Sequence, residues 1–141
     1  MNSEINLPKG FVGAGVSAGI KSNGSKDLAL IVNQGPQTFG TAVFTSNQVV
    51  AAPVIWSRQV VKDNNITAVL LNSGGANACT GPEGFADTHR SAEKVGETLQ
   101  LSSSDVAVCS TGLIGVRLPI ENLLSGIEVA ASSLNNQSLT D

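Results

Sequence analysis

Short runs of β-branched and aliphatic residues recur along the chain, and Gly, Pro or Asn bounds each run. This pattern is typical of strands that are buried on at least one face. We therefore predict strands at residues 27–32 (DLALIV), 41–45 (TAVFT), 54–56 (VIW), 67–72 (TAVLLN) and 106–110 (VAVCS).

Between the last two of these runs the hydrophobic period changes from that of a strand to that of a helix. Apolar and small residues fall three or four positions apart, which predicts a helix over residues 83–99. The residues in this stripe are Phe85, His89, Ala92, Val95, Gly96 and Leu99. Thr80 and Glu83 have the spacing of a capping box, and Pro82 suits the first turn.

A second helix is predicted to begin near Pro119. Ile120, Leu123, Leu124 and Ile127 trace one apolar stripe there, and Glu121 suits the first turn. Residues 132–141 (SSLNNQSLTD) lack apolar periodicity and are predicted to form a loop. The order of strands, Gly-containing turns and helices predicts an α/β fold, in which functional groups collect in loops at the carboxyl ends of strands.

Composition narrows the possible functions. The 141 residues include 11 acidic and 8 basic side chains, and a net charge of -3 argues against nucleic-acid binding. Hydrophobic residues make up 41%, enough for one core, whereas charged residues make up only 13%, about half the usual share. Such a surface is either partly covered by another chain or rich in Ser and Asn.

Cysteine spacing and hydropathy predict an ordinary intracellular domain. No run approaches the roughly 18 apolar residues of a membrane span, and the first ten residues lack the layout of a signal peptide, so we expect a cytoplasmic protein. Cys79 and Cys109 form no CxxC motif and have no metal-ligand spacing. We predict two buried thiols, no metal and no bound cofactor.

Two loops occupy the position where α/β folds place their chemistry. Residues 72–81 (NSGGANACTG) leave a strand through small residues only, so backbone N–H groups could meet a ligand there. The nucleotide-loop patterns are missing, and a tight strand-to-helix connection would explain the glycines equally well. In residues 110–115 (STGLIG), the Thr111 hydroxyl beside the Gly112 N–H could form an oxyanion hole, although the tripeptide alone is weak evidence.

Other candidate groups are less persuasive. Cys79 and His89 could form a nucleophilic pair, but a partly exposed helix histidine is the simpler interpretation. The carboxylates Glu83, Asp87 and Glu97 are expected on the outer half of the first long helix. The basic residues are scattered singly and are each expected to be solvated; they include Arg58, Lys62, Arg90, Lys94 and Arg117.

The two loops resemble two signatures of the ornithine acetyltransferase (glutamate N-acetyltransferase) family of arginine biosynthesis. The similarity runs in the same order from about Lys9 onward. Supporting stretches are residues 8–11 (PKGF), 18–21 (AGIK), 27–30 (DLAL), 42–47 (AVFTSN), 51–54 (AAPV) and 118–120 (LPI).

This resemblance implies a layered α/β sandwich and an enzyme that moves an acetyl group from N-acetylornithine to glutamate, with acetyl-CoA as a possible further donor. Family members cleave themselves in front of a threonine, which becomes the nucleophilic first residue of a second chain in a heterotetramer. Thr111, through its hydroxyl, and Gly112, through its backbone N–H, match the family's oxyanion hole. The loop at residues 72–81 is assigned to shaping the site.

The sequence ends before the family's TTD motif and before its Ala-Thr-Met cleavage site. We therefore expect residues 1–141 to be the amino-terminal part of one catalytic domain, completed by a further segment and by the second chain. Two alternatives stay open. One is a non-catalytic scaffold that kept the fold, and the other is a cysteine hydrolase that uses Cys79 and His89.

Overall fold

A four-stranded sheet forms the centre of the computed structural model, which describes residues 6–136. Its strands are β1 (Phe11–Val16), β2 (Leu28–Asn33), β3 (Ala68–Gly75) and β4 (Val106–Leu113), in that spatial order. The pairs β1–β2 and β2–β3 are antiparallel, whereas β3 and β4 are parallel. The helix between β3 and β4 makes the crossover that a parallel pair requires.

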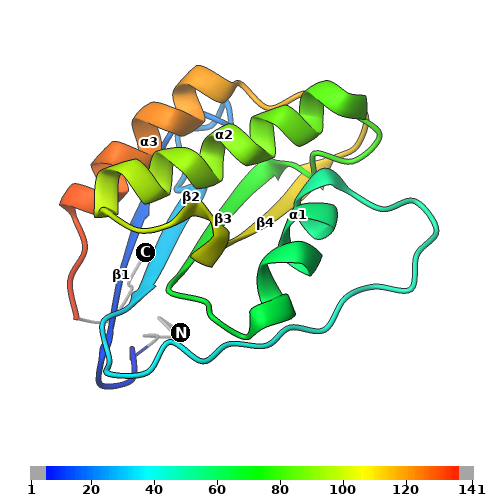
Figure 1. Ribbon diagram of the computed structural model, residues 1–141. Helices are drawn as coiled ribbons and strands as arrows, with labels where there is room; N and C mark the ends of the chain where they lie inside the picture. The colour runs from blue at the N-terminus through cyan, green and yellow to red at the C-terminus, as the bar shows by residue number, and fades with distance from the viewer. Residues whose placement is uncertain (1–5, 137–141) are drawn as a thin grey trace.

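Two long helices cover one face of this sheet. They are α2 (Gly81–Leu99) and α3 (Ile120–Ser132), which lie side by side above the strands in Figure 1. Alternate strand residues point toward them and form the core with α2 residues such as Ala92 and Val95. Leu30, Leu70 and Val106 are fully buried in this layer.

The opposite face of the sheet carries the residues in between, and within residues 6–136 no helix lies over it (Figure 1). We call this the open face and define it by Ala29, Ile31, Val69, Leu71 and Cys109. The register places Ala29 beside Leu71 and Leu71 beside Cys109, so these residues form a continuous apolar row. Leu71 and Ile31 are only half-buried, in contrast to their neighbours Leu70 and Leu30.

Helix α1 (Ala52–Val60) protects the outer edge of β4. The buried Ser57 hydroxyl donates to the Val108 carbonyl oxygen at 2.8 Å and accepts the Val108 N–H at 2.9 Å. The Trp56 indole N–H donates to the Val106 carbonyl oxygen at 2.9 Å. Side chains thus satisfy backbone groups that an exposed edge strand would offer to other chains.

Two predicted strands are wrong. Residues 54–56 belong to α1, where Pro53 in the first turn suits a helix start and the buried residues Pro53, Ser57 and Val60 have helical spacing. Residues 41–45 form a loop, because no strand lies beside them to complete a ladder; the nearest pairing is a single bridge between Phe39 and Asn65. Strand β1 was not predicted, since the glycines in FVGAGV weaken the strand pattern.

The remaining predicted elements are confirmed, with shifted ends. β2, β3 and β4 each extend beyond the predicted run, and α2 and α3 begin within two residues of the predicted positions. The capping box is wrong, because the Thr80 hydroxyl donates to the Asn77 side chain at 2.7 Å instead of capping the helix. Of the predicted loop at residues 132–141, residue 132 ends α3 and residues 137–141 lie outside the described part of the chain.

Candidate active site

The two loops singled out from the sequence lie side by side at the carboxyl ends of β3 and β4. The parallel register pairs Ser73 with Thr111 and Gly74 with Gly112. Beyond the ladder, the Ala76 N–H donates to the Leu113 carbonyl oxygen and the Gly115 N–H to the Ala78 carbonyl oxygen, each at 2.8 Å. The expectation that each loop follows the carboxyl end of a strand is therefore confirmed.

Thr111 and Gly112 are both exposed near the end of β4. Alternation along the strand places the Thr111 side chain on the open face, two residues beyond Cys109. The N–H and carbonyl groups of Val108 bond Ser57 and so point away from β3. Backbone groups along a strand alternate in direction, so the N–H of Gly112, four residues later, also points away from β3. The hydroxyl and the N–H of the predicted pair are thus both placed where a ligand outside the sheet edge could reach them.

Glycine is the only residue type that fits at position 112. Its φ of +128° is unfavourable for residues that carry a Cβ, and a Cβ would lie 2.5 Å from the Gly74 carbonyl carbon and 2.7 Å from the Gly75 nitrogen. The backbones of β3 and β4 therefore touch directly at this point. The glycines in both loops are explained by this close approach as well as by turn geometry.

Asn72 connects the two strands just before the candidate pair. Its buried side chain accepts a hydrogen bond from the Ser110 hydroxyl at 2.5 Å and donates to the Gly75 carbonyl oxygen at 3.2 Å. These bonds fix the residue before Thr111 and the glycine against which Gly112 packs.

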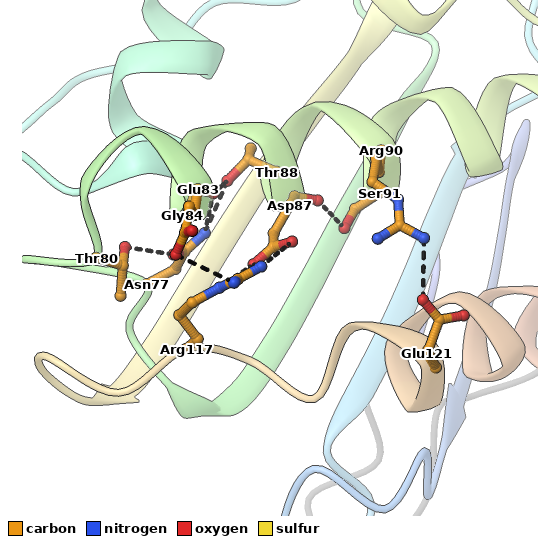
Figure 2. A network of polar contacts seen from close by, with 10 residues as sticks. All are labelled: Asn77, Thr80, Glu83, Gly84, Asp87, Thr88, Arg90, Ser91, Arg117 and Glu121. Atoms are coloured by element: carbon orange, nitrogen blue, oxygen red, sulfur yellow. Dashed lines mark hydrogen bonds and ion pairs between the residues drawn. The ribbon is translucent and has the colours of Figure 1, made fainter.

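Asn77 organises the start of α2. Its buried amide nitrogen donates to the Gly84 carbonyl oxygen at 2.8 Å and to the Thr88 hydroxyl at 2.9 Å (Figure 2). The loop reaches this arrangement through left-handed backbone at Gly74, Asn77, Cys79 and Gly81. The assignment of residues 72–81 to shaping the site stays a prediction, but the loop does lie against the end of β4.

Sequence reasoning missed Asp27. This buried carboxylate accepts the backbone N–H groups of Ala18 and Ile20 at 2.6 Å and of Lys21 at 2.8 Å. The loop that it fixes packs against β3, since a Cβ on Gly74 would lie 2.8 Å from the Ile20 side chain. An Asp at the start of an apolar run, shortly after a Gly-containing turn, is the one signal that pointed to it.

The expected outward position of Asp87 is wrong. Arg117 is exposed as expected, but it also pairs with Asp87. Asp87 is 2% exposed, and the Arg117 guanidinium donates to both of its oxygens at 2.8–3.0 Å (Figure 2). Hydrogen bonding to Asp87 and its charge raise the pKa of Arg117. The small residues Gly84, Thr88 and Ser91 mark the buried side of α2 and could have indicated that Asp87 shares it.

Both cysteines are exposed, so the prediction of buried thiols is wrong. Cys109 lies on the open face, which this chain does not cover, yet its neighbours desolvate the thiol enough to raise its pKa. His89 stacks on Trp56 with ring centroids 5.0 Å apart and lies 3.5 Å from Glu93. No hydrogen bond joins His89 to Cys79 in the described residues, so the structure gives the hydrolase alternative no support.

Residues 6–136 contain no group of three or more metal-ligating side chains and no helix long and apolar enough to cross a membrane. What the site presents is a pair of candidate hydrogen-bond donors on a rigid strand end. Such a pair can stabilise an oxyanion. Attack on an acyl group at neutral pH needs an activated nucleophile in addition.

Comparisons with known proteins place these features in a family. The model of the ArgJ family matches residues 12–140. The arginine biosynthesis bifunctional protein ArgJ of Streptomyces coelicolor is 60% identical over 131 residues, which are 93% of this chain and 34% of that protein. The ArgJ of Mycobacterium tuberculosis is 56% identical over 128 residues, which are 87% of this chain and 32% of that protein. The chain thus spans about a third of the length of the curated relatives it matches.

Solved structures agree with the sequence comparisons. Ornithine acetyltransferase complexed with ornithine, from Mycobacterium tuberculosis, superposes with a TM-score of 0.92 at 51% identity and covers 94% of this chain and 72% of that one. The bifunctional protein ArgJ of Bacillus halodurans gives a TM-score of 0.82 at 36% identity and covers 89% of this chain and 65% of that one. The α/β fold class and the resemblance seen in the sequence are confirmed.

Proposed function

The chain belongs to the ArgJ family, and from this premise we propose that it supplies the oxyanion hole of an acetyltransferase of arginine biosynthesis. The reaction is acetyl transfer from N-acetylornithine to glutamate in the cytoplasm, with acetyl-CoA as a possible second donor and with no bound cofactor or metal. The observation that carries the proposal is the exposure of Thr111 and Gly112 at the end of β4. Strand alternation counted from Val108 further implies that the Gly112 N–H points away from β3.

The chemistry needs two donors at one oxygen. When a nucleophile adds to the acetyl carbonyl, the carbonyl oxygen gains negative charge, and donors already held in place stabilise it without reorganising. We assign the Thr111 hydroxyl and the Gly112 N–H to this role. The close contact between Gly112 and the Gly74–Gly75 backbone supports this assignment, because it limits how far the end of β4 can move toward β3.

The nucleophile is proposed to be an amino-terminal threonine on a second chain of the same precursor. Its hydroxyl oxygen bonds to the acetyl carbon while its α-amine, which titrates near neutral pH, takes the hydroxyl proton. The tetrahedral adduct collapses, the C–N bond breaks, and the proton passes to the departing ornithine amine. The glutamate amine then attacks the acetyl-threonine ester, which restores the hydroxyl and completes the transfer.

Chain lengths support a two-chain enzyme. The matched region is 32% of the curated Mycobacterium tuberculosis protein but 72% of the solved chain from that organism, so the solved chain is less than half as long as the curated protein. We propose that further parts of the same enzyme pack on the open face. Its apolar row ends at Cys109, and Thr111 lies two residues further along β4, so a partner seated there would enclose the oxyanion pair.

The direct test is to purify the complete protein from its native source and to determine every chain by intact mass and amino-terminal sequencing. We expect a companion chain that begins with Thr, carries an acetyl group after brief exposure to N-acetylornithine, and transfers it to glutamate. A protein that lacks such a companion and moves no acetyl group would contradict the proposal and favour a non-catalytic scaffold.

A further inference from the structure

The segment that follows the candidate oxyanion pair is held only at its far end by burial of a large side chain of its own. We call residues 113–118 the exit loop. Leu113, Ile114 and Val116 are 65%, 67% and 56% exposed, so they contribute little to fixing its path. Leu118, at the far end, is buried against Gly75.

Polar contacts fix the loop before Leu118. Two backbone hydrogen bonds run from the Ala76 N–H to the Leu113 carbonyl oxygen and from the Gly115 N–H to the Ala78 carbonyl oxygen. Beyond these backbone bonds, the Arg117 side chain connects the exit loop to α2. The Arg117 Nε–H donates to Asp87 Oδ2 at 3.0 Å, and its Nη2 lies 2.9 Å from Oδ1 and 2.8 Å from Oδ2.

This contact differs from the other arginine pair of α2. In Figure 2, Arg117 reaches across to Asp87 and Glu83, while Arg90 meets Glu121 further along the helix. Arg90 and Arg117 are equally exposed, at 47%, so the two pairs differ in their carboxylates. Glu121 is 78% exposed, and exposed pairs of this kind contribute little. Asp87 is 2% exposed, so its two-pronged pairing with a planar guanidinium sets both distance and direction.

We propose that Arg117 is a positioning residue for the acetyl-transfer reaction: through buried Asp87 it ties the exit loop to α2, which keeps Thr111 and Gly112 in register with β3. This inference rests on the proposed function. Leu113, which directly follows Gly112, is both the last residue of β4 and the first of the exit loop, so movement of the loop acts on the strand end that carries the oxyanion donors. A displacement of about 1 Å in such a group can cost on the order of a hundredfold in rate.

The test compares Arg117→Gln, the double variant Arg117→Gln with Asp87→Asn, and the matched control Arg90→Gln, all in the complete enzyme. Arg117→Gln leaves a buried carboxylate without its partner, so it lowers both the denaturation midpoint and the turnover. The double variant removes that buried charge and recovers most of the midpoint, because a neutral pair avoids the desolvation penalty. The double variant does not restore the charged link between the exit loop and α2, which we call the tether.

We therefore expect kcat to fall about ten- to a hundredfold in both Arg117 variants while KM changes by less than about twofold, which is the signature of a lost transition-state interaction. Arg90→Gln should leave kcat and KM unchanged. Recovery of kcat in the double variant would overturn the proposal, because Arg117 would then serve only to neutralise Asp87. A raised KM with unchanged kcat would also overturn it.

Hydrogen exchange separates failure of this inference from failure of the proposed function. Amides of the exit loop, Gly115 in particular, should exchange faster in both Arg117 variants and at the wild-type rate in Arg90→Gln. This readout holds even if the complete protein transfers no acetyl group. Unchanged exchange in the Arg117 variants would show that the loop is held without the tether and would refute the inference.

Discussion

The two faces of the sheet are built from alternate residues of the same strands, but this chain buries one of them far more completely than the other. Leu70 points into the layer formed by α2 and α3 and is fully buried, whereas Leu71, the next residue, lies half-buried on the open face. The covered face supplies the core that holds the fold. The open face carries Cys109 and then Thr111, so the candidate chemistry lies on the side that this chain leaves uncovered.

The largest effect expected from this difference comes from truncating neighbouring leucines. Leu70→Ala should lower the free energy of unfolding by about 2–5 kcal/mol, because it leaves a cavity in a closed layer. Leu71→Ala should cost about 1 kcal/mol or less in this chain, since its site is partly hydrated already. Urea unfolding of both variants measures the gap. Equal losses would mean that the two faces are buried alike.

A smaller effect is expected at the protected edge of β4. Ser57→Ala removes the hydroxyl that bonds the Val108 N–H and carbonyl oxygen, and an unsatisfied buried N–H costs about 1–3 kcal/mol. Ser91→Ala is the matched control, because its buried hydroxyl donates only to the Asp87 carbonyl oxygen, at 2.7 Å. Unfolding measurements should show a clearly larger loss for Ser57→Ala, and a reversed order would contradict the role of α1 as an edge cover.

The smallest perturbation is chemical labelling of the open face. Cys109 has a raised pKa, so little thiolate is present at neutral pH, and its alkylation rate should rise by about tenfold per pH unit until the raised pKa is passed. In the complete enzyme we expect protection of Cys109 at every pH, because the proposed partner layer would cover it. Equal labelling of Cys109 in this chain and in the complete enzyme would argue that the open face stays free.

Local pattern predicted most of the architecture. The alternation in β2, β3 and β4 and the helical stripes of α2 and α3 each depend on neighbouring residues, so they are visible in the sequence. The short run at residues 54–56 was misleading because three apolar residues fit a helix as well as a strand. The run at residues 41–45 has strand composition but no neighbouring strand.

The place of the candidate site was predicted for a related reason. Functional loops follow the carboxyl ends of strands in α/β folds, and this singled out residues 72–81 and 110–115. The approach of the two loops to each other depends on the parallel pairing of β3 and β4, which the structure shows. The hydrogen-bond partners of Asp27 and Asp87 could not be predicted in this way. They lie six to nine residues from Asp27 and 30 residues from Asp87, and no local pattern connects them. Exposure of Cys109 depends on which face the helices cover, and its hydrophobic neighbours gave no indication of that.

The account depends most on the oxyanion assignment, and one kinetic comparison tests it. In the complete enzyme, Thr111→Ala should lower kcat for acetyl transfer about 10²–10³-fold, as expected for the loss of one oxyanion donor, while Thr111→Ser retains the hydroxyl and most of the activity. Thr98→Ala, which removes a helix hydroxyl bonded to the Lys94 carbonyl oxygen, controls for loss of a threonine elsewhere. Full activity in Thr111→Ala would contradict the account.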